Sequence, residues 1–306
     1  MKSLPKHAAR LPPHEPSTRH LTHATGRFIR STAGSRSLER GLALLRAFRP
    51  GTSVLTNEEL ARRTELPRPT VSRLTRSLVD AGFLAYDLSN RGYRLGAAVL
   101  SLANTFRYAA RDIDAALPLM RGVAEAERVN VGLAVADGTE MIYLDSVRRE
   151  RSRTHLPAPP GSRLPMELTA VGRAYLAANS EEERAEHYER LAVRYGARWP
   201  RLRASIERAR VAHERRGWCV AEWLPGRPVV ATALRGPDGS IRVLNVGFAA
   251  TRAERSERVR RLAPILLTLA ADIRTAWTSL AALAHGAGAR SATLTPSAAR
   301  GPGTRT

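Results

Sequence analysis

Three apolar stripes with helical spacing follow one another within residues 37–82. The first stripe repeats at the i, i+3, i+4 and i+7 positions of one helical face and ends at a Pro-Gly pair. The second starts at Thr56, and Glu59 completes a capping box with it. The third starts at Pro69, after a short turn, and ends at Gly82. Two short helices joined by a tight turn, with another helix before them, predict a helix-turn-helix unit.

The chain after Gly82 has the pattern of a short hairpin. Two apolar segments flank a turn-forming one, as expected for two antiparallel strands. A helix, a helix-turn-helix and a hairpin in this order predict a winged helix-turn-helix domain over residues 35–95. A helical pattern then resumes and predicts a linker helix over residues 96–110, which places the domain boundary near residue 110.

A second domain is predicted over residues 111–282. It starts with an amphipathic helix and then turns to a period of two, with hairpin turns at Asp137-Gly138 and Asp238-Gly239. The expected helices cover residues 112–128, 169–178, 180–192, 200–217 and 253–280, and the expected strands cover 129–135, 141–147, 229–234 and 241–248. Antiparallel hairpins with helices segregated between them predict an α+β domain, so the fold class is a two-domain α+β protein.

The net charge of the chain indicates what kind of partner it binds. The 306 residues carry a net charge of +21, and all but two of the 49 basic residues, Lys2 and Lys6, are Arg. A charge of this size predicts an anionic partner, either nucleic acid or an acidic membrane surface, although a GC-rich genome is an alternative source of the Arg bias. Residues 1–35 hold +5, residues 36–107 hold +6 and residues 108–306 hold +10. The first two segments are therefore the more basic per residue.

The ends of the chain and its lone cysteine narrow the class further. Residues 1–34, a basic tail, and residues 283–306, a Gly- and Ala-rich tail, are both predicted to be disordered. Cys219 is the single cysteine, so an internal disulfide and a multi-cysteine zinc site are excluded. If it has no functional role, we expect it to be a small buried apolar residue. The histidines of the first tail have no compact ligand spacing, so we predict no metal and no cofactor. No segment reaches the ~20 apolar residues of a membrane helix, and we expect a cytoplasmic protein without a membrane partner.

The third predicted helix presents polar side chains opposite its apolar stripe of Val71, Leu74 and Leu78. Hydroxyl and guanidinium groups in such positions can donate to phosphates and to base edges in a major groove. The candidate DNA-contact residues on this helix and on the wing after it are Arg68, Thr70, Ser72, Arg73, Arg76, Arg91 and Arg94. A solvated helix face in an Arg-rich protein is the alternative for the helix alone, and the hairpin that follows favours DNA binding.

The order of these elements resembles a known family. The segments SLERGLALLRAF, LTNEELARRTELPRPTVSRLTRSLVDAGFL and GYRLG resemble the amino-terminal winged helix of IclR-type transcriptional regulators. The segments MIYLDSV, SRLPMELTAVGRAYLAA and VVATALRGPDGSIRVLNVG resemble the GAF-like effector-binding domain of that family, and the resemblance covers roughly residues 36–280. It implies a homodimer joined through the amino-terminal domains, often a dimer of dimers, that binds double-stranded DNA and a small carboxylate effector.

The resemblance also implies an effector pocket in the second domain. The residues that fall on its positions are Leu164, Met166, Ala170, Val171, Cys219, Glu222, Val229, Asn245 and Gly247. The first four lie where the chain enters a helix, and the amides at a helix N-terminus favour an anion. Val229 stands where many members carry Cys, and Asn245 and Gly247 stand where many carry a pair of serines. Ordinary core packing is the alternative role for each of these residues.

These observations predict a sequence-specific DNA-binding regulator whose DNA affinity changes when a small organic acid binds. Thr70, Ser72 and Arg73 are expected on bases, the other four arginines on phosphates, and a two-fold dimer requires a palindromic operator. An enzyme acting on a small acid, with the winged helix as a protein-contact module, is the alternative. The sequence offers that enzyme no Ser elbow, HExxH motif or glycine-rich phosphate loop, and His187 and His213 lie on polar helices where solvated side chains are expected. A nonspecific nucleic-acid coating protein is a third hypothesis.

Overall fold

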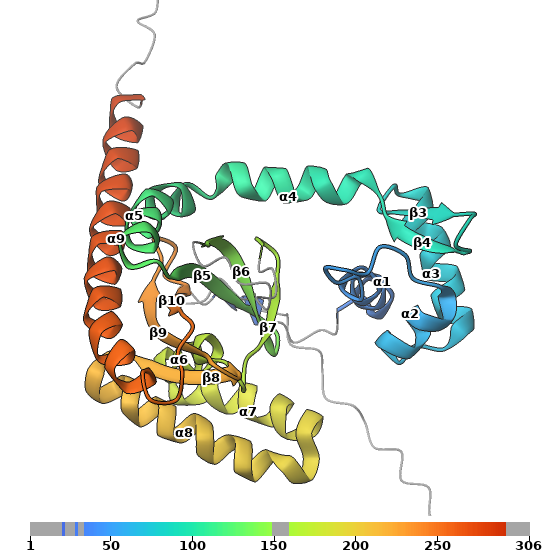
Figure 1. Cartoon of the computed structure of the whole chain (residues 1–306). Coiled ribbons are helices and arrows are strands. Elements are labelled where there is room, and N and C mark those ends of the chain that lie inside the picture. The colour runs from blue at the N-terminus through green and yellow to red at the C-terminus, as the bar shows by residue number, and fades with distance from the viewer. Residues whose placement is uncertain (1–19, 22–27, 30–33, 149–158, 292–306) are drawn as a thin grey trace, which may run out of the picture. The chain divides into compact units, whose positions relative to one another are not determined.

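The chain consists of two units that each have a hydrophobic core of their own. Unit 1 is Met1–Val99 and unit 2 is Leu100–Thr306. The division falls within α4 (Ala97–Ala109), the helix that the sequence predicts as the linker. The computed structural model describes residues 20–21, 28–29, 34–148 and 159–291 (Figure 1).

Unit 1 contains the predicted helix-turn-helix. Its helices are α1 (Arg36–Arg46), α2 (Asn57–Thr64) and α3 (Arg68–Asp80). The predicted capping box starts α2, because the Thr56 hydroxyl accepts from the Glu59 amide over 3.2 Å and the Glu59 carboxylate accepts from the Thr56 amide over 2.8 Å. Glu65 ends α2 in the left-handed conformation, with φ +56°, and so turns the chain into α3.

One small core joins these helices to the wing. Leu44, Leu55, Leu60 and Val71 are fully buried in it. The wing strands β3 (Leu84–Asp87) and β4 (Gly92–Leu95) pair antiparallel. Leu55 exchanges two backbone hydrogen bonds of 2.8 and 2.9 Å with Tyr93 of β4. The wing is therefore fixed to the segment that leads into α2.

Unit 2 is built on a six-stranded antiparallel sheet with the order β7-β6-β5-β10-β9-β8. Its strands are β5 (Asn130–Asp137), β6 (Glu140–Val147), β7 (Arg163–Pro165), β8 (Cys219–Leu224), β9 (Arg227–Arg235) and β10 (Ile241–Gly247). The two predicted hairpins form the centre of this sheet. The edge strands β7 and β8 are absent from the sequence-based prediction, and a bulge between Glu222 and Leu224 interrupts β8.

Helices cover both faces of the sheet (Figure 1). One face packs on α5 and α9, and the other on α6, which in turn packs on α7 and α8. The bounds are α5 (Arg111–Glu127), α6 (Ala170–Ala178), α7 (Glu181–Tyr195), a 3-10 turn (Gly196–Arg198), α8 (Trp199–Arg216) and α9 (Arg255–Ser291). Successive strand residues point to opposite faces, so they alternate between two cores.

Polar contacts join α5, α9 and β10 at one end of the core on the α5 and α9 face of the sheet. The Trp277 indole of α9 donates to the Asp112 carbonyl of α5 over 2.8 Å. The Asp112 carboxylate accepts from Arg242 of β10 over 3.2 Å, and both of these side chains are largely buried. Asp112 therefore links both covering helices to the central strand.

Both predicted tails contain regular structure. Strands β1 (His20–Leu21) and β2 (Phe28–Ile29) pair within the first tail, and α9 continues to Ser291, past the predicted end at residue 282. Residues 281–291 are rich in Ala and contain no Pro, and Ala has the highest helix propensity, so the helix continues. The rest of the predicted disorder, at residues 1–19, 22–27, 30–33 and 292–306, lies outside the described residues.

No membrane-spanning helix can be assigned in the described part of the chain, because none of its helices combines the required length and apolarity.

Two helical glycines provide a matched test of the packing in unit 2. A Cβ on Gly172 of α6 would lie 2.1 Å from the Met166 carbonyl oxygen, whereas a Cβ on Gly122 of α5 would meet no atom within 4 Å. We expect Gly172→Ala to lower the free energy of unfolding by about 1–3 kcal/mol, because the backbone must shift. Gly122→Ala should leave it unchanged or raise it by about 0.5–1 kcal/mol. Urea unfolding followed by circular dichroism measures both, and equal stability of the two variants would contradict this packing of α6.

Candidate DNA interface and effector pocket

The buried face of α3 differs from its predicted stripe at one position. Val71 is fully buried as predicted. The second fully buried residue of α3 is Thr75, which the predicted stripe does not include. The Thr75 hydroxyl donates to the Ser72 carbonyl over 3.1 Å, which satisfies the buried polar group. Leu74 and Leu78 pack against the core while remaining partly exposed. A hydroxyl that bonds its own helix backbone thus takes a core position that an apolar pattern does not predict.

The predicted DNA-contact residues of α3 lie away from this core. Ser72, Arg73 and Arg76 are exposed, and Thr70 is partly exposed at the edge of the face. In the described part of the chain, the guanidinium groups of Arg73 and Arg76 form no ion pair. The face therefore presents unneutralised donors of the kind that bind phosphates and guanine edges.

Arg68, at the start of the same helix, already has an acidic neighbour. Its guanidinium lies 2.6 Å from the Glu58 carboxylate of α2, and both side chains are about 70% exposed. An exposed pair of this kind contributes about 0–1 kcal/mol. A phosphate can therefore replace Glu58 at little cost.

The wing holds the other two predicted arginines at its tip and on its second strand. The Asp87 carboxylate accepts from the Asn90 amide over 2.9 Å, and this bond, with the nearby Arg94, lowers the pKa of Asp87. Arg91 follows in the left-handed conformation with φ +47°. Arg91 and Arg94 are both exposed. The turn is thus fixed by its own side chains and leaves both arginines accessible.

Six of the nine predicted effector residues belong to one apolar cluster on the α6 face of the sheet. These are Leu164, Met166, Ala170, Val171, Cys219 and Val229. They come from β7, from the start of α6 and from β8 and β9. Leu164 and Val229 are partly buried and the other four are fully buried. Segments far apart in the sequence therefore meet in one place.

Asn245 and Gly247 of β10 lie on the same face as this cluster. Asn245 pairs across the sheet with Ala231 on one side and Gly132 on the other, and Ala231 pairs with Cys219. Gly247 pairs with Val229. The row therefore combines one amide with two small neighbours, Gly132 and Ala231, in place of large apolar side chains.

Asn245 is the polar centre of this row. It is 3% exposed, and its Oδ1 has no hydrogen-bond partner among the described residues. Burial raises the pKa of Tyr143, and a side-chain hydrogen bond from Asn245 acts in the opposite direction. One end of the buried amide thus meets Tyr143 while the other is left for a ligand or a water, since a buried polar group without a partner is costly.

Glu222 does not join the other predicted pocket residues. It is exposed. It lies two residues after Val220 on β8, so it points to the same face of the sheet as Val220, which packs toward α5 and α9. Its carboxylate accepts from the Gly226 amide over 2.8 Å and pairs with Arg255 over 3.3 Å. The structure therefore places Glu222 on β8 beside the β8–β9 turn, on the face opposite Cys219, because an odd spacing along a strand reverses the side-chain direction.

The N-terminus of α6 is less open to an anion than its sequence suggests. The Thr169 hydroxyl accepts from the Gly172 amide over 3.2 Å. Glu167, just before the helix, is fully buried and accepts a hydrogen bond from the Tyr195 hydroxyl. The chain therefore supplies its own acceptor and its own negative charge at this helix end.

The two histidines expected to be solvated are instead packed. His187 is buried, with its Nε2 3.3 Å from the Tyr175 hydroxyl. His213 accepts from the Ala233 amide over 3.4 Å, and burial lowers its pKa. Both face inward because α7 and α8 pack on α6. No group of three or more His, Cys, Asp or Glu within the described ranges is placed to hold a metal ion.

Comparison with known proteins agrees with both units. Residues 37–88 match the IclR helix-turn-helix domain, and residues 110–275 match the bacterial transcriptional regulator IclR C-terminal domain. The chain belongs to the IclR family of transcriptional regulators.

Relatives of this IclR-family chain are named as regulatory proteins. It is 33% identical to the HTH-type transcriptional regulator TsaQ1/TsaQ2 of Comamonas testosteroni over 65% of this chain and 71% of that one. It is 29% identical to the Pca regulon regulatory protein of Pseudomonas putida over 78% and 82%. The crystal structure of an IclR family transcriptional regulator from Brucella abortus is similar, with a TM-score of 0.72 and 34% identity over 79% and 92% of the two chains.

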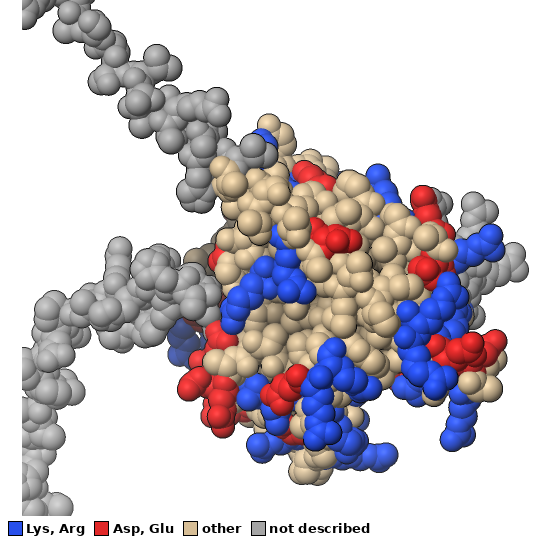
Figure 2. Space-filling view, turned by 90° about the vertical axis from the view of Figure 1, so that its left-hand side faces the viewer, with Lys and Arg blue, Asp and Glu red and all other residues tan. Residues whose placement is uncertain are grey.

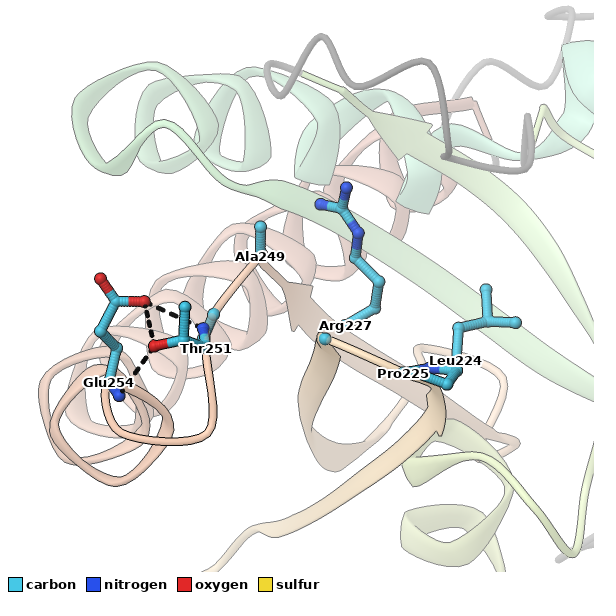
Figure 3. Close-up of a pocket in the computed structure, with 8 residues that line it drawn as sticks. Leu224, Pro225, Arg227, Ala249, Thr251 and Glu254 are labelled. Atoms are coloured by element: carbon cyan, nitrogen blue, oxygen red, sulfur yellow. Dashed lines mark hydrogen bonds between the residues drawn. The ribbon is translucent and has the colours of Figure 1, made fainter.

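An open hollow of about 680 Å³ lies between the β8–β9 turn of this IclR-family chain and the segment that joins β10 to α9. Leu224 to Arg227 line one side, and Ala249 to Thr251 with Glu254 line the other. Arg227 and Ala249 continue the alternation of Val229 and Gly247, so the hollow lies just beyond the row that holds Gly247. In Figure 3 the Arg227 side chain and Glu254 lie on opposite sides of it. Thr251 binds the Glu254 carboxylate through its amide and hydroxyl, and Arg227 contributes a guanidinium group to the same lining.

Gly132 and Tyr143 lie beside Asn245 but are absent from the sequence-based prediction of the pocket. A Cβ on Gly132 would lie 2.4 Å from Cε1 of Tyr143 and 2.8 Å from Oδ1 of Asn245, so only glycine lets these two side chains meet. The available signal is a glycine inside a strand pattern, which marks a close approach. That signal identifies neither Tyr143 nor Asn245 as the neighbour.

Cys219 should react very slowly in the folded protein. Its Sγ lies 3.5 Å from the Ala170 carbonyl oxygen, and burial raises its pKa to about 12. At pH 8 the thiolate fraction is then roughly a thousandfold below that of an exposed thiol, whose pKa is about 8.5. We expect iodoacetamide to label the native protein at least 1000-fold more slowly than the chain in 6 M guanidinium. Equal labelling rates would contradict the burial of this cysteine.

Proposed function

We propose that this IclR-family chain is a sequence-specific DNA-binding regulator whose operator affinity is set by a small organic acid bound in unit 2. The observation that carries the proposal is the polar face of α3, where Ser72, Arg73 and Arg76 are exposed opposite the fully buried Val71 and Thr75. A recognition helix needs this division, because one face holds it in the domain while the other reads the groove.

The arginines divide into two roles in this proposal. Arg73, with Thr70 and Ser72, is assigned to base edges because it lies on the exposed face of α3. The remaining predicted contacts are assigned to phosphates, which position the domain without reading sequence. These are Arg68, Arg76, Arg91 and Arg94.

A homodimer is the assembly that the exposed apolar side chains support, with a dimer of dimers as its extension. Leu38 and Leu42 of α1 are at least half exposed, and so are Leu100, Leu102 and Phe106 of α4. Helix α4 has no buried residue although it is apolar overall. Burying these side chains against a second copy removes their cost in water. A two-fold dimer requires a palindromic operator with half-sites ~34 Å apart.

The effector is proposed to be a small carboxylate that occupies the space above Asn245 and Gly247. The unpartnered Asn245 Oδ1 supports a ligand with a hydrogen-bond donor, such as a hydroxyl group. Arg227, in the adjoining hollow, supports a carboxylate. An IclR homologue from Microbacterium hydrocarbonoxydans was crystallised in complex with 4-hydroxybenzoate, which carries both groups.

An ion pair offers a route from the pocket to the linker helix. Arg107, near the end of α4, pairs with Asp114 of α5 over 2.9 Å and with Asp145 of β6 over 3.4 Å. Asp145 is two residues from Tyr143 on the same strand. A ligand that displaces Tyr143 therefore changes the position of the Arg107 partner, and coupling of this kind is allostery when it changes DNA affinity.

Selection of bound genomic DNA followed by gel-shift titration tests the DNA-binding proposal. Arg73→Ala should relax base preference at one operator position by about 1–3 kcal/mol, because it removes a base contact. Arg91→Ala should weaken all sequences alike and reduce the slope of log K against log salt by about 0.9 for each chain of the dimer, because it removes one phosphate contact per chain. Arg260→Ala on α9 is the control. The assignment fails if neither change alters operator binding, or if scrambled DNA competes as well as the operator does.

The effector proposal is tested with the buried amide. A panel of small acids that includes 4-hydroxybenzoate is first screened for release of operator DNA. We expect Asn245→Leu to weaken the response to the active acid at least tenfold, since the bond to a buried acceptor is lost. Thr232→Val removes a buried hydroxyl that bonds the Gly217 carbonyl on the other face, and it should leave the response unchanged. An unchanged response of Asn245→Leu would place the effector elsewhere.

A further inference from the structure

Three exposed arginines form a stripe along α8. Arg201, Arg208 and Arg215 are seven residues apart, which is close to two helical turns, so their side chains share one face over ~21 Å. The residues that lie between them at i+3 and i+4 spacing are short and uncharged: Ala204, Ser205, Val211 and Ala212. We call the three side chains the arginine stripe. The small neighbours allow a long anionic partner to approach all three.

The acidic residues of α8 do not neutralise the arginine stripe. Glu207 accepts from the Tyr188 hydroxyl over 2.9 Å and pairs with Arg210 over 2.6 Å. Glu214 pairs with the same Arg210. Within residues 34–148 and 159–291, the three arginines of the stripe have no ion pair or hydrogen bond. The stripe therefore holds three positive charges without a partner in the described chain.

The position of α8 leaves the stripe accessible in unit 2. Ile206 and Ala209 are buried, whereas the arginine stripe lies on the outer side of the helix. Figure 2 shows cationic side chains gathered along the lower edge of unit 2, where α8 lies in Figure 1, with carboxylates among them. None of the three arginines belongs to the apolar cluster on the α6 face or lines the hollow beside it. The stripe is thus unexplained by the effector.

We propose that the arginine stripe binds the phosphate backbone of the DNA that flanks the operator. This second contact rests on the proposed DNA binding by unit 1. Duplex DNA carries one charge per ~1.7 Å of axis, so the ~21 Å stripe spans about a dozen phosphates and needs no particular base sequence. Operator DNA held by unit 1 is at high effective concentration for unit 2 of the same chain, which favours DNA over an acidic protein as the partner.

Operators of two lengths separate this contact from recognition by unit 1. The R201Q/R208Q/R215Q variant and the unaltered protein are titrated with duplexes of about 20 and 60 base pairs that carry the same central operator, at 50 and 200 mM salt. On the longer duplex, the loss of three phosphate contacts should reduce the slope of log K against log salt by about 2.7 for each chain of the dimer that contacts the flanking DNA. This fourfold rise in salt should therefore weaken the unaltered protein at least about 40-fold more than the variant. The two proteins should bind the shorter duplex alike.

The R252Q/R260Q/R274Q variant is the matched control. It removes three exposed arginines, at the start of α9 and along it, on the other face of the sheet, so its net charge changes by the same amount. Its binding to the longer duplex should match that of the unaltered protein. An unchanged slope for the stripe variant, or an equal loss in the control, would overturn the inference. Failure of the unaltered protein to bind the shorter operator would instead contradict the proposed function of unit 1.

Discussion

Every central strand of unit 2 supplies two cores at once, because helices cover both faces of the six-stranded sheet. On β10, Leu244 and Val246 pack toward α5 and α9, while Val243 and Asn245 face α6. A shift of one residue in register would exchange the two sets and bury each in the wrong core. This constraint fixes the strands, and the rigid strands then hold the pocket side chains in place. The same constraint holds Asn245 on the α6 face, where its amide oxygen has no partner among the described residues.

The two faces differ in what their side chains leave room for. The α5 and α9 side is filled by large residues such as Leu133, Phe248 and Trp277. The α6 side has Gly132, Ala231 and Gly247 near its centre. The α5 and α9 side therefore carries the large side chains, and the α6 side carries small ones near its centre. The ligand site proposed for the family chain lies on the α6 side.

The features that could be predicted from the sequence are those set by neighbouring residues. The capping box at Thr56, the two central hairpins and the outward face of α3 depend on local spacing, and the structure confirms them. Strand β8 depends on its partner β9 rather than on its own pattern, so a short segment ending in exposed residues gives no local signal. The displacement of Glu222 from the pocket has the same origin, because its face is known only once β8 is a strand. The proximity of Tyr143 to Asn245 requires the register between strands that are far apart in the sequence.

The two edges of the sheet restrict how copies of the protein can associate. Strand β7 has only three residues and ends at Pro165, while β8 is interrupted by its bulge and followed by Pro225. Proline and bulges deny an incoming strand its hydrogen bonds. The sheet is therefore closed to growth by strand addition, and neither amyloid-like stacking nor a continuous intermolecular sheet is open to the folded unit. Association through the described part of unit 2 is therefore left to its helix surfaces, whose side chains can distinguish one partner from another.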